Sequence, residues 1–132
     1  MSSSPRTATE LAEEYFRAWL APAENALSAV LASRVTFVGP LRRAEDREAC
    51  VQGLLGMPSR VVRDLVVHAR VADDVMTWFD LHPAVAPPTA TANWSHVRDG
   101  VIDQIRVTFD PRDLRAGLAA QHMPPEDQDD RR

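Results

Sequence analysis

Asp80 and His82 stand two residues apart in the segment 75–82, whose alternating pattern predicts a β-strand. Alternate residues of a strand share a face, so both side chains should point the same way as Trp78. In the preceding predicted strand, 61–71, we expect the apolar face to be buried. Its members are Leu65, Val67, Ala69 and Val71. A two-residue turn at Asp73-Asp74 would set Ala69 opposite Trp78 and Val67 opposite Asp80. The sequence therefore predicts a carboxylate among buried apolar side chains.

Burial raises the pKa of a carboxyl group toward the range that proton transfer uses, so Asp80 is a candidate acid/base. His82 is its candidate partner, because histidine titrates near neutrality. Structural interpretations remain open for both residues. Asp80 could pair with an arginine and stay ionised, and His82 could be solvated at the strand end, before Pro83. We expect no metal site, because the remaining histidines do not fall at ligand spacings.

Tyr15 is the only tyrosine of the chain, and it shares a helical stripe with Trp19. A phenol in an apolar pocket can donate a hydrogen bond to a developing oxyanion, although aromatic residues at this spacing also form plain core. The orientation of Asn93 depends on the hairpin turn that follows it. A two-residue turn at Asp99-Gly100 would turn Trp94 and His96 inward, and a three-residue turn from Arg98 would turn Thr91, Asn93 and Ser95 inward.

Helices must hold these strands in place. Thr7 and Glu10 have the spacing of a capping box, which predicts the start of a first helix. A second helix should run from Pro22 to Ser33, and a third should begin after Asp46. Strands are expected at 35–38, 61–71, 75–82, 89–97 and 101–109. This order of two helices, a strand, a helix and an antiparallel meander indicates an α+β fold.

Composition limits the classes of partner. The 132 residues allow one domain, which we place at 7–118 between a loose tail at 1–6 and a disordered acidic tail at 119–132. All 15 basic residues are Arg and the net charge is −4, which indicates a GC-rich bacterial genome and no nucleic-acid partner. The single cysteine, Cys50, and the lack of a signal peptide or a membrane span predict a cytoplasmic protein.

Four segments, in this order and at these intervals, carry a resemblance to a known family. They are Tyr15–Trp19, Val35–Leu41, Arg47–Gly56 and Val97–Arg112. They resemble the nuclear-transport-factor-2-like (NTF2-like) superfamily, in its SnoaL-like and limonene-epoxide-hydrolase-like branch. The resemblance implies a cone-shaped, curved antiparallel sheet with three helices that enclose one pocket, in a protein that is often a homodimer.

The resemblance also assigns candidate residues. Tyr15 falls at the oxyanion-hole tyrosine of the ketosteroid isomerases and Asn93 near their second donor, but their general base falls at Gly39. Asp80 falls at one catalytic aspartate of the epoxide hydrolases, whereas their arginine falls at Trp78. Polyketide cyclases of this family use a single acid/base aspartate and no cofactor. The family register favours the three-residue turn, and hence Asn93 inward.

The leading hypothesis is a cofactor-independent cyclase, isomerase or dehydratase of bacterial secondary metabolism or catabolism, acting on a polyketide- or terpenoid-like substrate. Asp80 would transfer a proton with His82 as its partner, while Tyr15 and Asn93 would polarise an oxygen of the substrate. The residues expected to shape the pocket are Trp19, Phe37, Leu54, Trp78, Val107 and Phe109. One alternative is an epoxide hydrolase-like activity with a rearranged site. The other is a non-catalytic module for binding a small ligand or for dimerisation.

Overall fold

The computed structural model describes residues 6–56 and 61–121, and for 61–66 only the backbone. The elements, in chain order, are α1 (Ala8–Leu20), α2 (Glu24–Ala29), β1 (Leu31–Val38), β2 (Arg43–Ala44), α3 (Arg47–Leu55), β3 (Val61–Val71), β4 (Asp74–His82), β5 (Thr89–Arg98), β6 (Val101–Thr108) and α4 (Arg112–Gln121). The α+β class is confirmed, and the predicted meander corresponds to β3 to β6.

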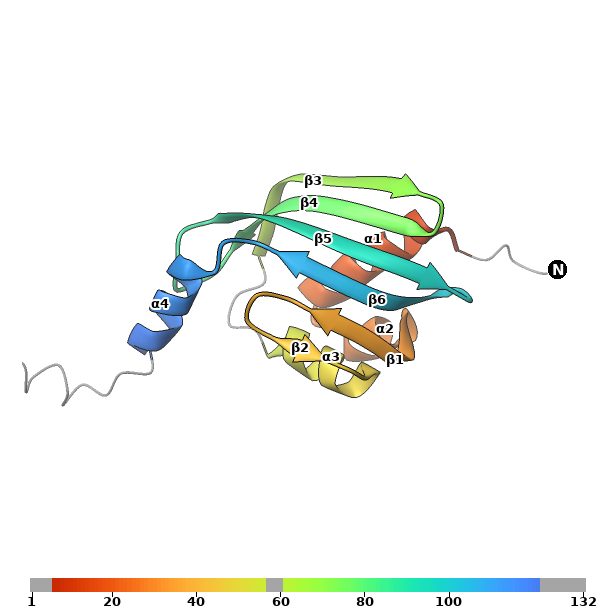
Figure 1. Cartoon of the computed structure of the whole chain (residues 1–132), viewed down its shortest axis with the longest axis horizontal. Coiled ribbons are helices and arrows are strands. Elements are labelled where there is room, and N and C mark those ends of the chain that lie inside the picture. The colour runs from red at the N-terminus through yellow and green to blue at the C-terminus, as the bar shows by residue number, and fades with distance from the viewer. Residues whose placement is uncertain (1–5, 57–60, 122–132) are drawn as a thin grey trace, which may run out of the picture.

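The six strands form one curved sheet in the order β2-β1-β6-β5-β4-β3. β1 runs parallel to β6, whereas the other neighbours are antiparallel, so the sheet is mixed rather than fully antiparallel. α1, α2 and α3 lie on one side of the sheet, and α4 lies beyond the ends of β5 and β6 (Figure 1). We call the side that faces α1 the inner face and the opposite side the outer face.

The predicted starts of the first and third helices are confirmed. Thr7 Oγ1 accepts from the Glu10 amide at 3.1 Å and the Glu10 carboxylate accepts from the Thr7 amide at 2.8 Å, which completes the capping box of α1. Asp46 Oδ1 accepts from the Ala49 amide at 2.8 Å and so caps α3. Local side-chain chemistry determines both helix starts.

The second helix is shorter than expected. The helix ends at Ala29 instead of running to Ser33, and β1 begins at Leu31. The Ile102 amide of β6 donates to the Val30 carbonyl at 2.8 Å, and Leu31 pairs with Ile102. The predicted helix is wrong here because a strand distant in the sequence forms backbone hydrogen bonds with this segment.

The predicted orientation of β3 and β4 is also wrong. Val67 is 52% exposed, Val71 76% and Met76 45%, so the face expected to be buried is the outer face. The structure does not describe the side chain of Leu65, the remaining large residue of that predicted face. The buried residues of β4 are instead Thr77 and its neighbours at alternate positions, Val75, Phe79 and Leu81. α1 covers this other side, where the Phe16 and Phe79 rings pack edge to face with centroids 5.2 Å apart.

The β3–β4 turn lies one residue earlier than predicted. Ala72 and Asp73 form it, with Ala72 at φ 55°, and Ala69 therefore lies opposite Met76 instead of Trp78. Each β3 residue therefore lies opposite a β4 residue two positions from the predicted one. Because alternate residues of a strand share a face, the residues predicted to share a face of the sheet still do so. The error about burial therefore arises from the choice of face and not from the register.

The β5–β6 hairpin combines features of the two turns that the sequence allows, the two-residue turn and the three-residue turn. Its turn has two residues, Asp99 at φ 54° and Gly100 at φ 79°, as the first alternative requires. The register then shifts between Val97, opposite Ile102, and His96, opposite Gln104, so that Asp103 is an extra residue in β6. This bulge turns Asn93 inward and Trp94 outward, which is the outcome of the second alternative.

α4 was not expected from the sequence. Gly117 lets it approach the segment after β4 closely, since a Cβ atom there would lie 2.1 Å from the Val85 carbonyl oxygen. The Arg115 guanidinium also reaches the Pro40 carbonyl at 3.5 Å. Residues 119–121, which were predicted to lie in a disordered tail, belong to α4, which runs to Gln121. The rest of that predicted tail, 122–132, and the predicted tail at 1–6, apart from residue 6, lie outside the described residues.

Candidate functional site

A cavity of about 380 Å³ lies against the inner face of the sheet. Its wall includes residues of α1, α3 and α4, of the inner face, and of the loops 39–42 and 83–85. The volume is near the lower end of the range for small-molecule sites, which is about 300–1,000 Å³. The lining is mostly apolar, so the cavity fits a small molecule with a largely apolar surface.

Five of the six residues predicted to shape the pocket line this cavity. They are Trp19, Phe37, Leu54, Val107 and Phe109. Trp19 Nε1 donates to the Leu54 carbonyl at 3.1 Å, which fixes the indole of α1 against α3. The sixth residue, Trp78, is 48% exposed on the outer face, so its predicted place in the pocket is wrong.

Tyr15 enters the cavity wall from α1 and is only 1% exposed. None of the hydrogen bonds among the described residues involves its hydroxyl. Burial, and secondarily the neighbouring Cys50, raises the pKa of Tyr15 well above its ordinary value. The phenol therefore stays protonated at neutral pH, where it can donate a hydrogen bond to a ligand oxygen but cannot serve as a base.

Asn93 lies on the cavity wall within a row of buried polar residues. The row runs along the inner face of β4 and β5 and consists of Thr77, Thr91, Asn93 and Ser95, none more than 2% exposed. Asn93 Nδ2 donates to Ser95 Oγ at 3.1 Å, which leaves one N–H and the carbonyl oxygen of the amide. Asn93 can therefore both hold its place in the sheet and bind a polar atom in the cavity.

Cys50 lines the same cavity from α3. Burial, with a smaller contribution from Asp46, raises the pKa of its thiol to about 12. A thiol with this pKa is protonated at neutral pH and is a poor nucleophile. Cys50 thus behaves as a small apolar residue, as its position on the helix suggests.

The structure places Asp80 and His82 away from the cavity. Both belong to β4 positions that alternate with the buried ones, and neither is among the lining residues. Asp80 pairs in register with Ala90 of β5 and Arg63 of β3, on the outer face with Trp78. The prediction that Asp80 lies in an apolar pocket is wrong, because α1 covers the opposite side of this strand.

Arg42 is a lining residue that the sequence reasoning missed. It follows Gly39-Pro40, whose turn is closed by the hydrogen bond from the Gly39 amide to the Arg42 carbonyl at 2.9 Å. Leu114 and Leu118 of α4 were missed as well. The Gly-Pro turn signals a loop beside the strand, but no local signal shows that this loop and α4 meet over one cavity.

The described residues also bear on metal binding and on membrane insertion. No group of three or more His, Cys, Asp or Glu residues is arranged to hold a metal ion there. No described helix has the length and apolar character needed to cross a membrane.

No family model matches the chain, and no curated protein matches it. Solved structures do. An NTF2-like protein of unknown function from Cytophaga hutchinsonii is 25% identical over 87% of this chain and 99% of its own, with a TM-score of 0.75. The fold is that of the NTF2-like proteins. The predicted resemblance is thereby confirmed at the level of fold.

Two other similar structures illustrate how varied this fold is. One is an LEH-like epoxide hydrolase of M. tuberculosis, 18% identical over 86% of this chain and 90% of its own, with a TM-score of 0.65. Another is a hypothetical protein with a ketosteroid isomerase-like fold from Catenulispora acidiphila, in complex with trimethylamine. It is 20% identical over 90% of this chain and all of its own, with a TM-score of 0.67. At these identities the likeness establishes the fold, and activity must be argued from the cavity.

Proposed function

We propose that the chain binds a small, mostly apolar molecule in this cavity and holds it by one carbonyl or hydroxyl oxygen. The observation that carries the proposal is the pairing of an apolar wall with uncharged polar groups, of which Tyr15 and Asn93 have donors left for a ligand, whereas the Thr91 hydroxyl donates to the Thr89 carbonyl. A buried phenol and a buried amide recognise an oxygen atom, because leaving either unpaired in an apolar site is unfavourable. Neither a carboxylate nor a histidine is among the described lining residues.

Binding of acetophenone and ethylbenzene tests this proposal, since the two have similar shapes and only the first carries a carbonyl oxygen. We expect acetophenone to bind about three- to tenfold more tightly, the range for one added hydrogen bond. Tyr15→Phe and Asn93→Ala should each reduce that preference, whereas Asn25→Ala, on the exposed part of α2, should leave it unchanged. Equal affinities for the two ligands would contradict the proposal, as would failure of both to bind.

A second candidate is cofactor-independent isomerisation or cyclisation of the bound molecule. One observation favours it: the Tyr15 phenol is kept neutral inside an apolar site, where a donor stabilises a developing enolate oxygen. Hydrogen–deuterium exchange of the acetophenone methyl group in D₂O, followed by NMR, tests it. No described lining residue can accept the α-proton, so hydroxide from solvent would take it while Tyr15 donates a hydrogen bond to the enolate oxygen. We expect exchange faster than in buffer alone and slower with Tyr15→Phe. Exchange at the buffer rate would contradict catalysis and leave binding intact.

Epoxide hydrolysis is not proposed. Asp80, the aspartate that the resemblance assigns to that chemistry, is absent from the cavity wall. Because neither Asp80 nor His82 is among the lining residues, our proposal gives them no acid/base role.

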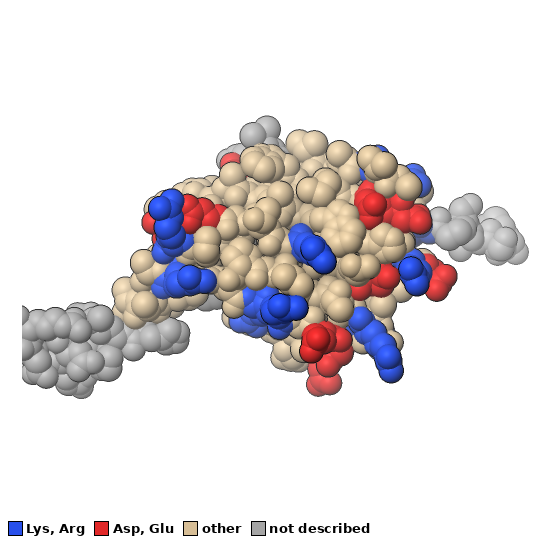
Figure 2. All heavy atoms as spheres, viewed as in Figure 1, with Lys and Arg blue, Asp and Glu red and all other residues tan. Residues whose placement is uncertain are grey.

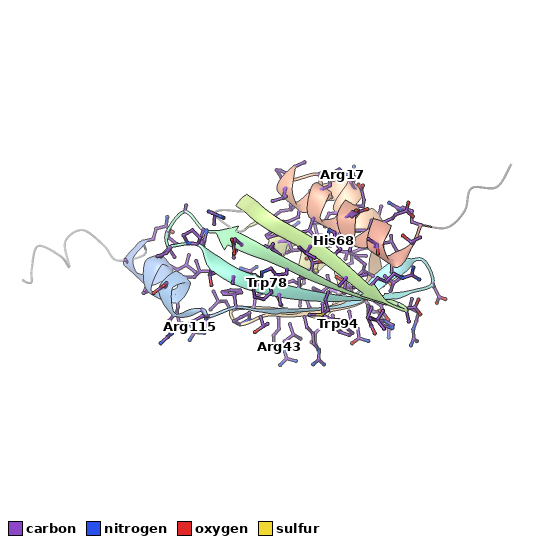
Figure 3. All side chains as sticks on the ribbon, turned by 90° about the horizontal axis from the view of Figure 1, so that it is seen from above. Arg17, Arg43, His68, Trp78, Trp94 and Arg115 are labelled. Atoms are coloured by element: carbon purple, nitrogen blue, oxygen red, sulfur yellow. The ribbon has the colours of Figure 1, made fainter. Side chains whose placement is uncertain are left out.

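We also propose that two copies of the chain associate through the outer face. Large apolar side chains are exposed there, including Val67, Met76 and Trp78. Many charged groups lie toward the margins of this face, but some arginines lie over its middle (Figure 2), and the Arg106 guanidinium lies 5.9 Å from the centre of the Trp94 ring, so a contact between two copies has to accommodate these cations. Figure 3 shows Trp94 on the same side, away from α1.

Sedimentation across a range of protein concentrations tests this association. Trp78→Glu should shift the chain toward monomer by placing a charge in the centre of the contact. Leu20→Glu is the matched control, because Leu20 is an exposed leucine, 40% accessible, at the end of α1. A wild-type chain that is monomeric at all concentrations would contradict the dimer.

A further inference from the structure

Arg42 has an unusual position for a surface arginine. Its side chain lies across Gly53 of α3, where a Cβ atom would come 2.6 Å from Nη1 and 2.8 Å from Cδ. Both residues line the cavity, yet Gly53 is buried and Arg42 is exposed. The guanidinium therefore lies where the cavity opens to solvent, and the absence of a side chain at residue 53 gives it room to do so.

The charge of this guanidinium is not matched within the cavity. Arg42 is the only charged residue among the described residues that line it. No ion pair or side-chain hydrogen bond in the described part of the chain involves Arg42. The other arginine near this loop, Arg115, already donates to the Pro40 carbonyl. An open donor group at the rim of an apolar cavity favours an anionic group on whatever enters.

We propose that the ligand is an amphipathic carboxylate whose acid group pairs with Arg42 at the opening while its apolar body fills the cavity. Tyr15 and Asn93 then meet a keto or hydroxyl oxygen farther inside, since both are almost fully buried. The ligand class is therefore a small apolar keto- or hydroxycarboxylic acid. This inference rests on the proposed binding function and specifies its substrate class.

Geometry supports a directional contact rather than a diffuse field. The Gly39–Arg42 hydrogen bond fixes the backbone of the loop, and the stem of Arg42 rests on α3. A guanidinium held in this way can offer two parallel N–H groups to a carboxylate. Solvent at the opening screens the pair, so we expect a preference of about two- to fivefold over a neutral isostere and not more.

Three probes with one carbon skeleton test the inference: para-acetylbenzoate, para-acetylbenzamide and para-acetylbenzylamine. All carry the ketone that Tyr15 and Asn93 would bind, and they differ only in the group at the opposite end. Calorimetric titration at neutral pH should rank the carboxylate first, the amide second and the cationic amine last. The preference for the carboxylate should weaken as salt is added, because the contact is near solvent.

Variants separate this contact from the general charge of the surface. Arg42→Gln should make the affinities for the carboxylate and the amide equal, and Arg42→Lys should restore part of the difference. Arg43→Gln is the matched control: it removes the same charge one residue later, and Arg43 does not line the cavity. Figure 3 shows Arg43 on the outer side of the sheet. Gly53→Ala should reduce the preference without removing any charge, because its methyl group displaces the Arg42 side chain.

The outcomes distinguish the two proposals. Equal affinity of the wild-type chain for the carboxylate and the amide would overturn the role of Arg42 and leave oxygen binding in the cavity intact. The role of Arg42 is overturned in the same way if Arg43→Gln abolishes the preference as fully as Arg42→Gln. Each of the three probes carries the ketone. If the chain binds none of them, the result would count against both proposals.

Discussion

On the inner face of the sheet, four polar residues are almost completely buried, whereas four large apolar residues of the outer face are exposed. The buried residues are Thr77, Thr91, Asn93 and Ser95, and the exposed ones are Val67, Val71, Met76 and Trp78. The inner polar groups are hydrogen-bonded, as with Thr77 Oγ1 and His68 Nδ1 at 2.8 Å, which makes their burial tolerable. The comparison shows that apolar character alone does not decide which face of a strand the helices cover.

The largest contrast is expected between two neighbouring residues of β4. Phe79 is buried against the Phe16 and Trp19 rings, so Phe79→Ala should reduce the free energy of unfolding by about 3–5 kcal/mol. Trp78→Ala, on the exposed face, should change it by less than about 1 kcal/mol. Urea unfolding at low protein concentration measures both. A larger loss from Trp78→Ala would mean that the assignment of the two faces is reversed.

A smaller effect should follow from removing a buried polar group. Asn93→Leu takes away the donor to Ser95 Oγ, so the free energy of unfolding should fall by about 1–3 kcal/mol. Asn25→Leu, at an exposed position, is the control and should have little effect. Thermal or urea unfolding gives both values. An Asn93→Leu chain as stable as the wild type would indicate that the polar row contributes nothing to stability.

The cavity should also make the fold sensitive to alkaline pH. Burial raises the pKa of Tyr15 and brings that of Cys50 to about 12. In the unfolded chain the phenol loses its proton with a pKa of about 10 and the thiol with a pKa of about 8.5. The unfolded state therefore loses protons first, and the free energy of unfolding should fall as pH rises above about 8.5. Urea unfolding from pH 7 to 11 measures the slope, and Cys50→Ala should flatten its first part. A Cys50→Ala chain with the wild-type slope would argue against a buried thiol.

The smallest effect is expected at Asp80. Because its side chain belongs to the outer face and lies outside the cavity, Asp80→Asn should leave acetophenone affinity unchanged. It should alter stability by no more than about 0.5 kcal/mol. Calorimetric titration and urea unfolding provide the two measurements. A loss of ligand binding would restore Asp80 as a site residue and contradict the assignment of faces.

Much of the candidate site follows from features that act over a few residues. The capping box at Thr7 begins α1 in the correct phase, and this phase turns Tyr15 and Trp19 toward the cavity. Asp46 likewise caps the start of α3, and the resulting phase of α3 turns Leu54 toward the cavity. The resemblance added the inward orientation of Asn93, which the sequence pattern had left open. Arg42 and α4 were missed because their positions at the cavity depend on packing between distant segments.

The positions of most helices and strands follow from local sequence features, since caps, turns and alternation depend on neighbouring residues. Three other features depend on packing between distant segments. The strand pairing of Leu31 with Ile102 shortens the second helix. The extra residue Asp103 in β6 places Ser95, and not Trp94, opposite the buried Ile105. The packing of α1 determines which face of β4 is buried. Each depends on contacts between residues far apart in the chain, which no local pattern specifies. The same reason applies to Asp80: its strand was predictable, but the side on which its carboxylate lies was not.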